Sequence, residues 1–421
     1  MKKETIAGEG PLILVHGRNQ LSRILLAAGR RLRERASCLI ALAACLFGAL
    51  PGNTALAQAR QQSARPEIVR WLPLTKFYDT PQPLPPGKPG DLIRSEQADD
   101  YPLAPGVNAL RILYHSRSAN GDDVASSGLI LYPDQKPRTG GWPIIAWAHG
   151  AGYVGRGCAP SLSRILPHGP FLTMYVNLGY AVVATDYAGL GTDFPYAFAD
   201  MQSNAADVIA AIPAARTALP QLGKRWIAMG AESSSRTVIA VAEQEHELRD
   251  PDFLGSIAIG RLDDLESEYG DADGDSPLFL AYGIKAVYSR FEANAILTEK
   301  GIQQYAQVGR SCDVPTTEEN GFVKPQWQNN KFVKDFFSRN RLAQGSVSAP
   351  LLLLDSDTDS ARVAEVIASM RRLCRQGASV QLQRYADPNP GNVIGDSVRD
   401  QMAWIEGRLA GRTAPTSCNT H

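Results

Sequence analysis

Short apolar segments alternate with stretches of helical spacing along most of the chain after residue 106. Residues 107–132 alternate between apolar and polar side chains, which predicts antiparallel strands at the edge of a sheet. Residues 142–148 are continuously apolar, as expected for a strand buried on both faces. Further strands are expected at residues 179–185, 225–230, 255–260, 349–354 and 380–385, and helices at residues 203–219, 237–243 and 397–409. This alternation predicts an α/β protein with a mostly parallel sheet flanked by helices, whose active groups follow the carboxyl ends of the strands.

Two long segments depart from this pattern. Residues 58–105 are rich in proline and polar residues and are interpreted as an N-terminal arm. Residues 263–348 are irregular and too long for an ordinary connection between a strand and a helix, so we expect a cap inserted over the site. The main domain is therefore placed at residues 106–421.

The N-terminus has the pattern of an export signal. Four arginines between Arg30 and Arg35 precede an apolar run at residues 37–47, and Ala55–Ala57 offers an A-x-A cleavage site before Gln58. We expect residues 1–57 to be a signal peptide and the mature protein to be periplasmic or secreted. The apolar run is shorter than the ~20 residues of a membrane span, so no stable membrane span is expected after cleavage. A lipoprotein cleavage at Cys45 is the alternative interpretation.

Composition excludes some partners. The chain has 421 residues, of which 44% are hydrophobic, and Lys+Arg and Asp+Glu balance at 43 each. Such a balance argues against nucleic acid as a partner and favours a small ligand bound locally. The acidic stretch Asp271–Asp275 resembles a calcium loop, but position twelve would be Tyr282 rather than Glu, so a solvated turn is expected and no metal site.

Residues 225–243 have the shape of a nucleophile elbow. An apolar segment leads into Gly230-Ala231-Glu232-Ser233-Ser234-Ser235 and then into an Ala/Val-rich helical run, which is how an α/β-hydrolase exposes its nucleophile. The small-x-nucleophile-x-small pattern fits in two frames. One frame places Glu232 at the tip and the other places Ser233 there.

Several motifs together resemble the secretory lipases of the α/β-hydrolase superfamily. They are Trp147-Ala148-His149-Gly150, Cys158-Ala159-Pro160-Ser161, Gly179–Thr192, the segment from Trp226, Leu373-Cys374-x-x-Gly377 and Trp404–Gly411. The likeness covers most of residues 100–418. It implies an α/β-hydrolase fold, an ester hydrolase that acts on acyl esters through a Ser-Asp-His triad, a cap over the acyl pocket, and no metal or cofactor.

Four cysteines remain after signal cleavage, an even number in an exported protein, so two disulfides are expected. Spacing alone allows three pairings. The resemblance implies that Cys158 pairs with Cys312 and Cys374 with Cys418.

The triad that the resemblance implies is incomplete. The family pattern W-x-x-x-G-H-S-Q-G-G, laid from Trp226, places Glu232 on the serine, whereas a shift by one residue places Ser233 there. The family acid falls on Asp359, although Asp355, Asp357 and Asp359 together also fit a solvated turn. The family histidine falls on Pro390, and no histidine lies between Asp359 and His421.

The site candidates therefore gather where strands end. Glu232, Ser233, Asp359 and His149 are the catalytic candidates, and Gly150, Ala151, Gly152 and Asp186 are the candidates for contact with substrate. His149 and Asp186 also match residues that the family carries as scaffold.

Three functions remain open from these residues. The first is a hydrolase homologue that binds an acyl ester or another apolar ligand but is weak or inactive as a serine esterase. The second is an active lipase or carboxylesterase that uses Ser233 with a displaced base, His149 or His168. The third uses Glu232 as nucleophile or general base.

Overall fold

The computed structural model describes residues 71–419, apart from residues 151, 271, 273–274, 313–319, 357–359 and 387–389. The predicted signal peptide and the predicted site residues Ala151 and Asp359 lie outside the described residues, as does His421.

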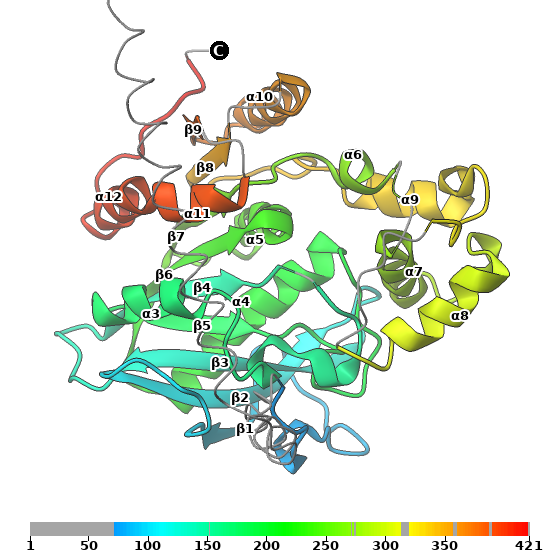
Figure 1. Cartoon of the computed structure of the whole chain (residues 1–421). Coiled ribbons are helices and arrows are strands. Elements are labelled where there is room, and N and C mark those ends of the chain that lie inside the picture. Colours follow the sequence, from blue (N-terminus) through cyan, green and yellow to red (C-terminus); the bar gives the residue numbers. More distant parts are fainter. Residues whose placement is uncertain are drawn as a thin grey trace, which may run out of the picture. The chain divides into compact units, whose positions relative to one another are not determined.

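A single mixed sheet organises the described chain (Figure 1). Its order is β1-β2-β3-β5-β4-β6-β7-β8-β9. β2 and β3 pair antiparallel, as do β1 with β2 and β3 with β5, and the strands from β5 to β9 run parallel. The strands are β1 (Leu92–Gln97), β2 (Val107–Arg117), β3 (Asp123–Pro133), β4 (Trp142–Ala148), β5 (Ala181–Thr185), β6 (Leu222–Ala231), β7 (Phe253–Ile259), β8 (Leu351–Ser356) and β9 (Val380–Tyr385). The α/β fold and its antiparallel edge, both predicted from the sequence, are confirmed.

Helices cover both faces of this sheet. They are α3 (Gly169–Asn177), α4 (Met201–Ala218), α5 (Ser235–Leu248), α10 (Ser360–Arg375), α11 (Val393–Asp396) and α12 (Val398–Leu409). α4, α5 and α10 pack in one hydrophobic cluster, and α3, α11 and α12 pack in the other. Along β4, Ile144 and Ala146 belong to the first cluster whereas Ile145 and Trp147 belong to the second. Burial on both faces is the reason that this strand is apolar throughout.

The segment between β7 and β8 is built of helices. It contains α6 (Leu265–Tyr269), α7 (Ser276–Val287), α8 (Glu299–Val308) and α9 (Lys331–Arg339), with the 3-10 turns η5 (Ala293–Ala295) and η6 (Trp327–Asn329). Its buried side chains, such as Phe291, Trp327 and Phe336, belong to the same cluster as α4 and α5. This segment coincides with most of the stretch predicted as a cap.

The N-terminal part holds a strand that the sequence did not indicate. Residues 92–97, within the stretch interpreted as an arm, form β1 and pair with β2. The sequence of this strand, LIRSEQ, does not alternate between apolar and polar residues, and none of its residues is buried, so it carried no strand pattern. The sheet therefore begins earlier in the chain than expected.

Two disulfides join distant segments. Cys158 pairs with Cys312 and Cys374 with Cys418, so the pairing implied by the resemblance is confirmed. The first ties the turn η2 (Arg156–Cys158) to the segment after α8. Within the described residues, no helix combines the length and the apolar character needed to cross a lipid bilayer.

Candidate active site

The turn between β6 and α5 is the centre of the site. β6 ends at Ala231, and the 3-10 turn η4 (Glu232–Ser234) leads directly into α5. Glu232 has a left-handed backbone, with φ of 55°, and its side chain is exposed. A Cβ on Gly230 would lie 2.8 Å from the Ser234 carbonyl oxygen, so only glycine fits before this turn. Of the two residues that the sequence could place at the tip of the elbow, the structure places Glu232 there.

The serines that follow Glu232 differ in environment. Ser234 Oγ lies 2.8 Å from the carbonyl oxygens of both Ala148 and Ala231, which ties the turn to β4. Ser235 Oγ lies 2.8 Å from the Ile259 oxygen at the end of β7. Both serines are buried and serve as backbone ties. Sequence reasoning could have singled out these two serines, because the lipase pattern has two glycines at their positions.

Ser233 is half-buried and faces the end of β4. A Cβ on Gly150 would lie 3.3 Å from Ser233 Oγ, so Gly150 leaves room for this hydroxyl. Gly152 is exposed, and a Cβ there would meet open space. Of the three predicted substrate contacts after β4, Gly150 therefore lies at the elbow, and Ala151 lies outside the described residues.

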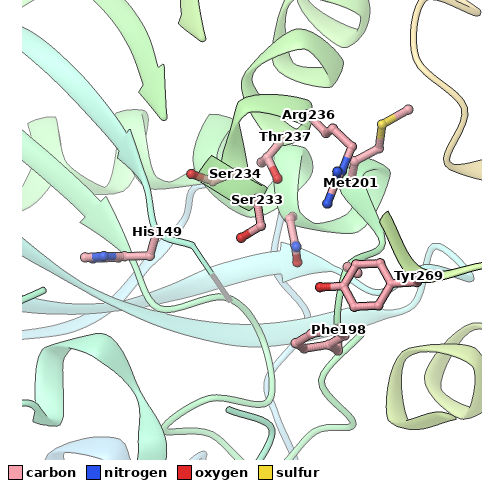
Figure 2. Close-up of a pocket in the computed structure, with 10 residues that line it drawn as sticks. His149, Phe198, Met201, Ser233, Ser234, Arg236, Thr237 and Tyr269 are labelled. Atoms are coloured by element: carbon pink, nitrogen blue, oxygen red, sulfur yellow. The ribbon is translucent and has the colours of Figure 1, made fainter. Parts of the chain in front are cut away.

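His149 does not have the geometry of a base for Ser233. Its Nδ1 accepts a hydrogen bond from Trp147 Nε1 at 3.2 Å, so the neutral ring carries its proton on Nε2 and has no free lone pair. Burial, together with the nearby His168, lowers the pKa of His149 to about 3. Figure 2 shows its ring extending away from Ser233.

His168 is the imidazole on whose pKa the charge of Glu232 acts. It precedes α3 with φ of 55°, and its ring lies 5.5 Å from the Trp147 ring. Burial lowers the pKa of His168, and the charge of Glu232 acts in the opposite direction. Glu232 and His168 thus share one edge of the sheet.

Asp186 follows β5 and is fully buried. Its Oδ1 accepts a hydrogen bond from the Ser161 amide at 2.7 Å, and its Oδ2 accepts one from Ser127 Oγ at 2.6 Å and one from Ser161 Oγ at 2.5 Å. Burial raises the pKa of this carboxyl group. With 0% exposure and both oxygens bonded, Asp186 holds the scaffold together and is not placed to contact a ligand directly.

The lipase pattern places its acid and its histidine after β8 and β9, at Asp359, which lies outside the described residues, and at Pro390. Asp355, the first acidic residue of the predicted turn, is buried and pairs with Arg362, and burial raises its pKa to about 6. Pro390 begins the 3-10 turn η7 (Pro390–Asn392) after β9. No histidine occurs in the sequence between His246 and His421.

The cavity beside the elbow is small. It encloses about 10 Å³, which is at most the space of one water molecule. Figure 2 shows Phe198, Arg236 and Tyr269 among the residues that line it. Arg236 is buried and pairs with Glu268 of α6. This arginine lies one helical turn after Glu232, and no sequence motif pointed to it. An acyl group could enter beside the elbow only if these side chains moved.

Comparison with known proteins agrees with this architecture. No family model matches the sequence, and no curated protein sequence matches it. Among solved structures, lipase A of Candida antarctica in its closed state superposes with a TM-score of 0.69 at 16% identity, covering 82% of this chain and 88% of that one. The rice cell wall degrading esterase LipA of Xanthomonas oryzae gives a TM-score of 0.63 at 18% identity, covering 78% of this chain and 100% of that one. At these identities the likeness shows the fold, so the chain has an α/β-hydrolase fold similar to that of known lipases and esterases.

Proposed function

We propose that this protein is an exported lipase-like homologue that binds an acyl ester or another apolar ligand and is weak or inactive as a serine esterase. The observation that carries the proposal is Glu232 at the left-handed tip of the elbow, where a serine esterase holds its nucleophile. The two disulfides fit the oxidising compartment that the predicted signal peptide implies.

A glutamate carboxylate cannot replace serine as the nucleophile in ester hydrolysis. Attack of Glu232 on an ester carbonyl would form a mixed anhydride, which is more reactive than the ester itself. Covalent catalysis gains only when the intermediate divides one difficult step into two easier ones. Ester hydrolysis through an acyl-Glu232 intermediate is therefore disfavoured.

Neither His149 nor the residue at the histidine position of the lipase pattern can activate Ser233. His149 has its lone pair engaged by Trp147, and the position that the lipase pattern gives to histidine holds Pro390. A serine hydrolase that loses a triad member keeps about 10³–10⁴-fold acceleration over water, through binding and the oxyanion hole. Any residual turnover is expected at that level.

The alternative function is ester hydrolysis with Ser233 as nucleophile. Its half-buried hydroxyl beside Gly150 favours this alternative. His168, on the same edge of the sheet as Glu232, would be the base in that case.

Turnover of p-nitrophenyl butyrate distinguishes the two functions. We expect wild type and S233A to hydrolyse the ester at equal, low rates, and the double variant Glu232→Ser/Pro390→His to exceed Glu232→Ser alone at least tenfold. The second comparison holds the elbow serine constant and tests the histidine position. Loss of most wild-type turnover in S233A, with the fold retained by circular dichroism, would instead establish the Ser233 esterase.

A further inference from the structure

The two outermost strands of the sheet differ in what covers their free sides. They are β1 and β9, and Figure 1 shows them at opposite ends of the sheet. The C-terminal segment covers β9, because the Ser417 amide donates to the Val380 oxygen at 2.6 Å and Ser417 Oγ accepts from the Leu382 amide at 3.1 Å. The disulfide between Cys374 and Cys418 anchors this segment. Among the described residues, no segment makes comparable backbone bonds to the free side of β1.

The backbone of β1 presents hydrogen-bonding groups on the side away from β2. The Ala98 amide, directly after β1, donates to the Ala109 oxygen of β2 at 3.0 Å. In an antiparallel pair, successive residues alternate between bonding the partner strand and facing away from it. Counting back from Ala98, Ser95 and Gln97 therefore direct their N–H and C=O groups to the free side. Both residues are exposed, so these groups are open to another strand.

An exposed strand edge invites pairing with another chain. Many proteins protect such an edge with charges, above all with lysine, which repels a second copy of the same strand. β1 instead carries one cation and one anion two residues apart, Arg94 and Glu96. The register shift between Leu92 and Arg94 limits regular pairing to about the last five residues of the strand. Within that stretch the charges balance, so a second copy is not repelled.

The charges of β1 are self-complementary in one register. Two copies related by a two-fold axis pair antiparallel, with the same residues contributing on both sides. If the pairing is centred on Ser95, Arg94 of each copy lies opposite Glu96 of the other. If it is centred on Glu96, two carboxylates lie opposite each other, and centring it on Gln97 overlaps only the end of the strand. Opposite charges stabilise a cross-strand pair and like charges destabilise it, so the register centred on Ser95 is favoured.

Both charged side chains are positioned and still have bonding capacity. They lie on the same face of β1, because side chains two residues apart share a face of a strand. Glu96 Oε1 accepts a hydrogen bond from Arg111 Nη1 at 3.2 Å, and the Glu96 side chain is still 43% exposed. Arg94 Nη1 donates to the Lys76 oxygen at 3.1 Å, and a guanidinium has five N–H donors in all.

We propose that β1 is the interface through which two copies of this chain form a two-fold symmetric dimer, with Ser95 at the centre and an Arg94–Glu96 ion pair on either side of it. The two sheets then join into one. The contact is small, so we expect a reversible dimer with a dissociation constant of about 10–100 µM. The inference does not rest on the proposed function, since β2, β3, β5 and β4 lie between β1 and the strand β6 that leads to the elbow.

Sedimentation velocity of the mature protein, over a hundredfold range of concentration around that value, tests the dimer. We expect wild type to change from monomer to dimer across the range. Ser95→Pro removes an N–H that faces the free side and leaves the bonds to β2 intact, so it should weaken the dimer at least tenfold. Ser95→Thr keeps the N–H and is the matched control, which should dimerise like wild type. A wild-type protein that stays monomeric, or a Ser95→Pro variant that keeps its fold by circular dichroism and dimerises as tightly as Ser95→Thr, would overturn the proposal.

Charge reversal tests the register. Arg94→Glu places carboxylates opposite each other at both pairs, so it should weaken the dimer at least tenfold, whereas Arg138→Glu, at an exposed turn after β3, should have no effect. A mixture of Arg94→Glu with Glu96→Arg restores opposite charges and should form a heterodimer at concentrations where each variant alone is monomeric. A mixture that associates no more than its components would contradict the proposed interface. Ser95→Pro keeps the test decisive if Glu96→Arg unfolds beside Arg111.

Discussion

Two carboxylates at the same edge of the sheet illustrate opposite uses of an acidic side chain. Asp186, after β5, is fully buried and accepts hydrogen bonds from Ser127 and Ser161 on both oxygens. Glu232, after β6, is exposed and stands on a left-handed backbone that side chains with a Cβ rarely adopt. The first stabilises the fold, whereas the second is held in a strained conformation. Such strain is maintained by surrounding structure and is concentrated at functional sites.

The largest expected effect is at Asp186. Asp186→Ala would leave the Ser161 amide and the hydroxyls of Ser127 and Ser161 buried without a partner, and we expect a loss of about 3–5 kcal/mol in the free energy of unfolding. Urea unfolding followed by circular dichroism measures it. Asp193→Ala is the matched control, because Asp193 is partly exposed and pairs with Arg156 at 2.8 Å. An exposed pair contributes about 0.2–1 kcal/mol. If Asp186→Ala and Asp193→Ala lose equal free energy of unfolding, Asp186 is no more important to the fold than an exposed ion pair.

A smaller effect of opposite sign is expected at Glu232. A left-handed conformation costs a residue with a Cβ roughly 1–2 kcal/mol, and glycine avoids this cost but loses more entropy on folding. Glu232→Gly should therefore stabilise the protein by about 0.5–1 kcal/mol. Glu266→Gly, at an exposed position in α6, should destabilise it by about 0.5–1 kcal/mol. If both glycine variants lose stability alike, Glu232 stores no strain.

The sequence predicted the fold because many of its strands and helices are indicated by a local periodicity of apolar and polar residues. The continuous apolar run of β4 follows from burial on both faces. β2 and β3 are also buried over most of their length, but polar residues such as Ser126 and Ser127 lie among their apolar ones. The strand β1 was missed because it is short and its sequence, LIRSEQ, does not alternate. The disulfide pairing came from the resemblance to lipases, since the spacing of four cysteines allowed three pairings.

The site was only partly predictable. Residues at strand ends identified Glu232, His149 and Asp186, but their roles depend on side-chain hydrogen bonds that the pattern does not show. Ser127 lies 59 residues before Asp186, and the lone pair of His149 is engaged by a tryptophan two residues away. A local pattern cannot show either bond. The residue at the elbow tip was likewise undecided, because both frames satisfied the small-residue pattern and only the backbone angle separates them.

We propose that the elbow presents the Glu232 carboxylate in place of an activated serine. Intact-protein mass spectrometry after incubation with a fluorophosphonate tests it most directly, because this reagent forms a stable adduct with an activated serine. We predict that the mature wild-type protein stays unmodified under conditions that label a serine esterase completely. A stoichiometric adduct that peptide mapping assigns to Ser233, and that S233A abolishes, would show instead that the elbow holds an activated serine.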